Sequence, residues 1–230
     1  MNTMLVDWGE LVAALSCFML AHMLPARPAI RAAIVAAIGR RTYLVLYSTL
    51  SVGLLMWVAR AAARPPYVEI WPYDDRLLMV PAVGMVVACV LLVFGLGSPN
   101  PLSIGRAAGF DPNKPGVAAL VRHPVLWAAL IWAASHLAVN GDLAHVVVFG
   151  AFAVLAIVGM LALDARARRR LGNAWPHLAA RTSNVPFAGY LRGARPHMGS
   201  GTVVRLALSA LLFAGLVLGH EFLVGVPVPL

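Results

Sequence analysis

The sequence predicts an all-α integral membrane protein, a bundle of six membrane-spanning helices, on three observations. First, 61% of its 230 residues are hydrophobic and only 12% are charged, whereas soluble domains are about 45–50% apolar and about 25% charged. Second, the mean hydropathy is +0.82. Third, the apolar residues form continuous runs, whereas the strands of a membrane barrel alternate apolar and polar residues.

Each apolar run is close to the length that a helix needs to cross a bilayer. About 20 helical residues cross about 30 Å of hydrocarbon, and the apolar part of the fourth run, Pro124–Val139, is somewhat short. We expect a single domain over residues 1–230, without internal repeats. The predicted spans are residues 4–24, 42–60, 77–96, 117–139, 145–163 and 203–222.

Basic residues predict the orientation of these spans. Three segments, residues 25–41, 97–122 and 164–205, hold fifteen of the 18 Lys and Arg residues and would lie on one side. The positive-inside rule places that side in the cytoplasm, so both termini lie outside (N-out, C-out) and residues 164–202 form the main cytoplasmic loop. The net charge of +9 therefore reflects topology and anionic lipid, and no nucleic-acid partner is expected.

Two further features concern targeting and location. The first 26 residues contain no Lys or Arg, so we expect no cleaved signal peptide. Arg outnumbers Lys by seventeen to one, which suggests a GC-rich bacterial source and a multi-pass protein of the bacterial inner membrane. The stretch AAIVAAIGRR (32–41) is amphipathic enough to lie along the inner membrane surface.

Histidines are the main candidates for chemistry, because polar side chains at membrane depth are costly and tend to be functional. Five lie within or at the ends of spans; His177 and His197 lie in the basic loop and are expected to be solvated. Taken singly, each membrane histidine is explained by helix packing, but together they favour a redox or metal centre. No HExxH motif, paired carboxylates or Ser-His-Asp pattern is present, so the catalytic residues stay unknown. The five are His22, His123, His136, His145 and His220.

Spacing limits how these histidines can combine. On one helix, His123 and His136 would lie about 20 Å apart along the axis and point in directions about 140° apart, so they cannot ligate one ion together. His136 follows Ala129 and Ala133 on one face, which suits close approach of a helix or of a flat cofactor such as haem. Arg122, just before Pro124, is either a snorkelling arginine at a helix start or a clamp for an anionic group.

Several ordered motifs resemble the NnrU family of bacterial membrane proteins over nearly the whole chain. The family name implies a link to nitrite and nitric oxide reduction, and hence to denitrification and redox physiology. The motifs are His22 with Pro25, Arg27 and Arg31, then GRRTYLVLYSTLS (39–51), RHPVLW (122–127), SHLAVNGD (135–142), LGNAW (171–175) and TSNVPF (182–187).

The chain is also similar to the plastid 15-cis-zeta-carotene isomerase, which implies bound haem b and an isomerase-like reaction. That resemblance implies His22 and His136 as axial ligands of the haem iron, while a cysteine of the enzyme falls on Ala133. By membrane depth, however, His22 pairs better with His123, and His136 with His220 or His145. We therefore keep His123 and His220 as alternative ligands, and Arg122 as a candidate partner for a haem propionate.

Two other function classes stay open. RHPVLWAA with LGNAW and TSNVPF resembles membrane methyltransferases of the isoprenylcysteine carboxyl methyltransferase type, which implies an S-adenosylmethionine site at Arg122, His123 and residues 164–187; of the acidic pair expected there, only Asp164 is present. The other class is a non-catalytic assembly factor whose histidines only satisfy helix contacts. The partners expected are the lipid bilayer and either a small hydrophobic ligand or a redox partner.

Overall fold

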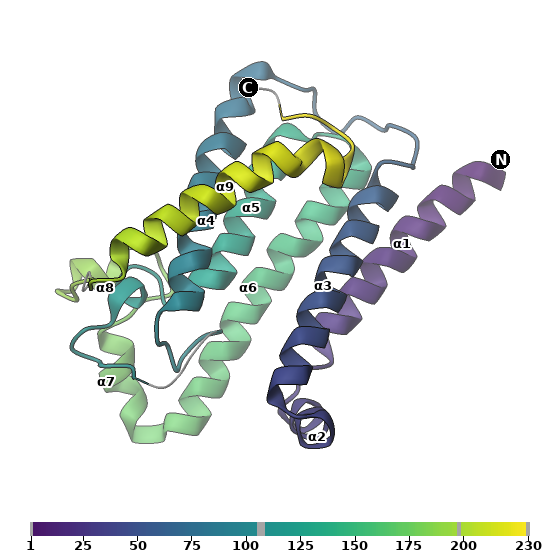
Figure 1. Ribbon diagram of the computed structural model, residues 1–230. Helices are drawn as coiled ribbons and strands as arrows, with labels where there is room; N and C mark the ends of the chain where they lie inside the picture. Colours follow the sequence, from purple (N-terminus) through teal and green to yellow (C-terminus); the bar gives the residue numbers. More distant parts are fainter. Residues whose placement is uncertain (1, 105–108, 197–198, 229–230) are drawn as a thin grey trace. The chain divides into compact units, whose positions relative to one another are not determined.

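Helices make up the regular structure of the protein. The computed structural model describes residues 2–104, 109–196 and 199–228, and in these ranges it contains helices and one isolated antiparallel bridge, between Glu69 and Asp142, but no strand. The chain divides into two compact units, which are described separately below (Figure 1). The first comprises Met1–Pro72, Gly141–Val148 and Gly219–Leu230, and the second comprises Tyr73–Asn140 and Phe149–Leu218.

Within the described part of the chain, four helical segments are long and apolar enough to cross a membrane. A fifth arises if α1 (Asn2–Met23) and α2 (Pro28–Ile38), which meet at 84°, are counted as one broken span. Helix α5 (Pro124–Val139) is apolar but has only 16 residues. The protein is thus a multi-pass helical membrane protein, while the count of six spans and the N-out, C-out orientation stay predictions. The four segments are α3 (Arg40–Ala62), Asp75–Gly97 with α4 (Met79–Gly97), Leu143–Ala180 with α6 (Leu143–Leu171), and α9 (Thr202–Val224).

Every predicted span contains a helix, but two boundaries differ. The fourth span was predicted from residue 117, whereas α5 begins at Pro124, after a 3-10 turn at Gly116–Ala119. Proline suits a first helical turn because it has no N–H to leave unpaired. Helix α6 continues to Leu171, eight residues past the predicted end, and the basic loop that follows holds two short helices, α7 (Trp175–Ala180) and α8 (Ala188–Leu191).

In the first unit, α1 packs along α3 (Figure 1). Leu11, Ala14 and Phe18 are buried on α1, and the Glu10 carboxylate accepts a hydrogen bond from Trp57 Nε1 at 3.1 Å and pairs with Arg64. Helix α2 has no buried residue. The lack of buried residues agrees with the prediction that residues 32–41 lie along the membrane surface. The position of these residues relative to the membrane stays a prediction.

The Asn-Gly-Asp exit of α5 has a structural role in the first unit. The Gly141 carbonyl accepts a hydrogen bond from Ile70 N–H at 2.7 Å, and Leu143 N–H donates to the Val68 carbonyl at 2.9 Å. A side chain at residue 141 would overlap the carbonyl oxygen and the ring of Trp71. Glycine is therefore required where the chain enters α6.

In the second unit, α4 packs closely against α5. A Cβ atom on Gly84 would lie 2.8 Å from Ser135 Cβ, and one on Gly95 would lie 2.9 Å from Pro124 Cγ. Small residues let helix backbones approach in this way where no hydrophobic effect drives helices together. On the side of α6, Phe152 lies with its ring centroid 5.2 Å from that of Trp132, so aromatic packing joins α5 to α6.

Candidate functional site

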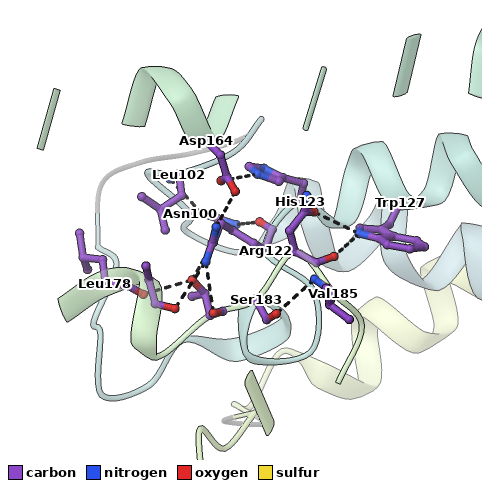
Figure 2. Close-up of polar contacts among 12 residues, drawn as sticks. Asn100, Leu102, Arg122, His123, Trp127, Asp164, Leu178, Ser183 and Val185 are labelled. Atoms are coloured by element: carbon purple, nitrogen blue, oxygen red, sulfur yellow. Dashed lines mark hydrogen bonds and ion pairs between the residues drawn. The ribbon is translucent and has the colours of Figure 1, made fainter. Parts of the chain in front are cut away.

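The Arg122 guanidinium of the second unit makes four hydrogen bonds, to Asp164 on α6 and to residues 179–182 (Figure 2). Its Nε donates to Thr182 Oγ1 at 3.0 Å, and its Nη1 donates to Asp164 Oδ2 at 2.6 Å. Its Nη2 donates to the carbonyls of Ala179 and Thr182 at 3.4 and 3.3 Å. The side chain is 8% exposed, so this is a buried cation whose donors are used within the protein.

Asp164 connects this arginine to His123. Its second oxygen, Oδ1, lies 2.9 Å from His123 Nε2. The His123 side chain is completely buried, and its other ring nitrogen, Nδ1, has no hydrogen-bond partner. Asp164 is the first charged residue after the apolar part of α6, and Arg122 and His123 immediately precede α5. The ion pair therefore ties the start of α5 to the polar end of α6.

Other side chains complete this arrangement, which we call the Arg122 cluster and define as Arg122, His123, Asp164, Trp175 and Thr182. The Trp175 ring lies under the guanidinium, with its centroid 4.9 Å from Cζ. Such cation–π contacts stabilise a charge that has lost its water. Outside the cluster, Asn100 Nδ2 donates to the Arg122 carbonyl at 2.8 Å, and Trp127 Nε1 donates to the Asn184 carbonyl at 3.0 Å.

Within the cluster, the Asp164 carboxylate is the counter-charge of Arg122. Burial lowers the pKa of the Arg122 guanidinium from its usual value, and the Asp164 carboxylate opposes this shift. An arginine remains charged under all ordinary conditions, so Asp164 neutralises a permanent buried cation. Four of the five N–H donors of Arg122 bond to protein oxygens, so a propionate or other anion would compete with these acceptors for the guanidinium.

His22 and His136, the predicted axial ligands, share one local geometry on different helices. His22 Nδ1 lies 2.8 Å from the Phe18 carbonyl oxygen on α1, and His136 Nδ1 lies 2.9 Å from the Trp132 carbonyl oxygen on α5. Because a carbonyl oxygen can only accept, each Nδ1 carries the proton and each Nε2 holds the lone pair of the neutral ring. His22 belongs to the first unit and His136 to the second.

The remaining histidines divide between structural contacts and the surface. His220 Nδ1 lies 2.6 Å from the Val226 carbonyl oxygen, and His145 Nδ1 lies 2.7 Å from Asp142 Oδ2. His177 is exposed on α7, as expected, whereas His197 lies outside the described residues. Within the described ranges, no group of three or more His, Cys, Asp or Glu side chains could hold a metal ion. A haem does not need such a group, because the porphyrin supplies four ligands of its iron and leaves one or two axial positions for the protein.

An apolar groove of about 530 Å³ lies on the α4–α5 pair of the second unit. Its lining side chains are apolar apart from Ser135, whose hydroxyl donates to the Trp132 carbonyl at 3.1 Å. The groove is thus a surface for hydrocarbon rather than for a polar ligand. It is lined by Met79, Val80, Val83, Gly84, Ile131, Ala134 and Ser135.

The sequence did not single out several residues that support Arg122. Thr182 lies in the TSNVPF motif and Trp175 lies in LGNAW. These two motifs were the features of the sequence that could have pointed to them. Asn100 lies in a proline-rich segment in which nothing about its spacing indicates a partner. The predicted methyltransferase segments do meet, since residues 122–123, 164 and 175–182 come together in the Arg122 cluster.

Comparison with known proteins gives one match. The model of a family described as NnrU protein matches residues 10–228. No curated protein and no solved structure matches the chain significantly.

Proposed function

The chain belongs to the NnrU protein family, and we propose that it is a haem-b-binding protein of the bacterial inner membrane, with His22 and His136 as its candidate iron ligands. The observation that carries this proposal is the hydrogen bond from Nδ1 of each histidine to a backbone carbonyl one turn earlier. Histidines that bind metals usually donate their other N–H in this way, which fixes the tautomer and the orientation of the ring. In a neutral ring with this hydrogen bond, Nε2 is the nitrogen that would bind iron.

The surroundings of the two rings also suit a flat, apolar cofactor. The His22 ring stacks on Phe18 with centroids 4.0 Å apart, and Tyr47 lies 5.6 Å away. The His136 ring lies 5.2 Å from the Phe149 ring. Aromatic side chains pack well against a large conjugated ring system.

Bound haem would supply one-electron redox chemistry, which suits denitrification-linked physiology and also an isomerase-like reaction. The protein's part is to hold two neutral imidazoles and to exclude water from the apolar span around them. The buried Arg122 cluster acts apart from this site, because its donors are used within the second unit. We assign it a structural role.

The test compares purified variants by absorbance spectroscopy in mild detergent. We expect His22→Ala and His136→Ala each to lose the Soret band or to change its position, because each removes one proposed axial ligand. His177→Ala is the matched control, since His177 is exposed on α7. A wild-type spectrum that both ligand variants retain would overturn the assignment.

A second candidate, an S-adenosylmethionine-dependent methyltransferase, draws on the convergence of Arg122, Asp164 and Thr182. These residues belong to the segments that the methyltransferase resemblance assigns to the cofactor. This function predicts that colourless protein binds S-adenosylmethionine and that Arg122→Lys weakens the binding. Calorimetric titration with S-adenosylmethionine separates the two candidates, because the haem function predicts no heat of binding. If the protein is a non-catalytic assembly factor, it should bind neither haem nor S-adenosylmethionine.

A further inference from the structure

The loop that follows α7 exposes four apolar side chains next to arginines. Val185 is 66% exposed, Phe187 60%, Tyr190 41% and Leu191 81%. The whole loop lies in residues 164–202, the segment predicted to be the main cytoplasmic loop. Large apolar side chains gathered on a surface mark a contact with a protein or a membrane.

Hydrogen bonds fix the depth of this loop relative to the end of the apolar part of α6. Apolar residues of α6 end at Leu163, so the edge of the hydrocarbon lies close to Asp164. Asp164 pairs with Arg122 at 2.6 Å. The Arg122 N–H in turn donates to the Ser183 carbonyl at 2.6 Å. The loop thus starts at the depth at which α6 leaves the membrane.

The loop is held rigidly in this position. Phe187 N–H donates to the Leu120 carbonyl at 2.8 Å, and Val185 N–H donates to Ser183 Oγ at 3.1 Å (Figure 2). Phe187 has a φ of 62°, which among the described residues is the one positive φ outside glycine. Non-glycine residues rarely adopt this conformation, and the hydrogen bond to Leu120 holds the backbone in it. The exposed ring is therefore available for a contact outside the protein.

The charges beside the apolar side chains identify that contact. Arg181, Arg192 and Arg195 are exposed, and the Arg195 guanidinium stacks on Tyr190, with Cζ 4.7 Å from the ring centroid. Apolar side chains flanked by basic ones are the pattern of segments that enter the headgroup region of an anionic leaflet. Aromatic rings favour the same region.

We propose that residues 185–195 form an interfacial anchor that inserts Phe187 and Leu191 into the leaflet from which α6 emerges and binds anionic lipid headgroups through Arg192 and Arg195. The lipid bilayer is the partner, and no spanning helix is involved in this contact. The backbone bonds from Phe187 N–H to Leu120 and from Arg122 N–H to Ser183 join the anchor to the start of α5. This inference does not depend on haem or on S-adenosylmethionine.

Collision measurements on nitroxide-labelled protein in lipid nanodiscs test the proposal. Leu191→Cys carries the label, in a background in which Cys17 is replaced by serine and Cys89 by alanine. The matched control is Asn173→Cys, because Asn173 is exposed and follows the end of α6, about 10 Å along the helix beyond Asp164. The reagents are oxygen, which concentrates in lipid, and a water-soluble nickel chelate.

We expect the ratio of oxygen to nickel collisions to be several-fold higher at residue 191 than at residue 173. The ratio should rise further when phosphatidylglycerol replaces part of the phosphatidylcholine, and Arg192→Gln with Arg195→Gln should abolish that rise. Equal ratios at the two positions would overturn the anchor. A high ratio that is insensitive to phosphatidylglycerol would overturn the headgroup contact.

Discussion

A single buried cation organises the polar end of the second unit. Transferring an isolated charge out of water costs many kcal/mol unless it is paired and fully hydrogen-bonded. Arg122 meets both conditions, through Asp164 and through the oxygen atoms of Thr182 and Ala179. The stability of this region therefore depends on the pair as a whole rather than on either residue alone.

Removal of Asp164 should be strongly destabilising. Asp164→Ala leaves the Arg122 charge buried without a counter-ion and removes the partner of His123, and such losses cost about 3–5 kcal/mol. The measurement is the midpoint of thermal unfolding in detergent, with Arg169→Ala as the control because Arg169 is exposed near the same end of α6.

The double variant provides the sharper comparison. Arg122→Ala combined with Asp164→Ala removes both charges, so it should be more stable than the sum of the two single changes predicts. Strict additivity, or an Asp164→Ala protein as stable as Arg169→Ala, would contradict the role of the cluster.

At the scale of elements, close helix packing depends on residues without side chains. Gly84 and Gly95 allow α4 to approach α5, with hypothetical Cβ contacts of 2.8 and 2.9 Å. Gly84→Ala should lower stability by about 1–3 kcal/mol, which is typical of overpacking. Gly53→Ala in α3 is the matched control, because a Cβ at residue 53 meets nothing within 4 Å. The measurement is the midpoint of thermal unfolding of each variant in detergent. Equal midpoints for Gly84→Ala and Gly53→Ala would argue against tight α4–α5 packing.

The entry to α6 provides a second element-level prediction. Gly141→Ala should disrupt the hydrogen bonds of Ile70 and Leu143, since the new methyl group would overlap Trp71. We expect a loss of stability larger than that of Gly84→Ala, because backbone rather than side-chain atoms obstruct the methyl group. Hydrogen exchange at residues 68–71 measures the local effect. Unchanged protection there would show that the segment does not need this glycine.

The long apolar helices could be predicted from the sequence because each follows a continuous run of apolar residues, whereas the short helices α7 and α8 in the basic loop could not. The boundary at Pro124 was also readable, since proline favours a first turn, although the predicted span began at residue 117. The contacts within the Arg122 cluster could not be predicted from the sequence. They join residues up to 60 positions apart, and hydropathy carries no information on which polar side chains meet across such distances.

At the scale of the whole molecule, orientation rests on the distribution of basic residues. We predict that alkaline phosphatase fused to the C-terminus is active, because that enzyme folds only outside the cytoplasm, and that a fusion after Asn173 is inactive. A green fluorescent protein series at the same two points serves as the control, with the opposite pattern expected. Active phosphatase at Asn173 would reverse the topology and place the basic loop outside.

Haem binding by His22 and His136 is the central claim, and the absorbance spectrum of the wild-type protein tests it most directly. The protein would be purified in mild detergent from haem-sufficient cells and measured before and after reduction with dithionite. We predict a stoichiometric Soret band that shifts on reduction, as expected for iron held by two neutral imidazoles. A preparation that is colourless, and that stays colourless after haem is supplied, would contradict the claim.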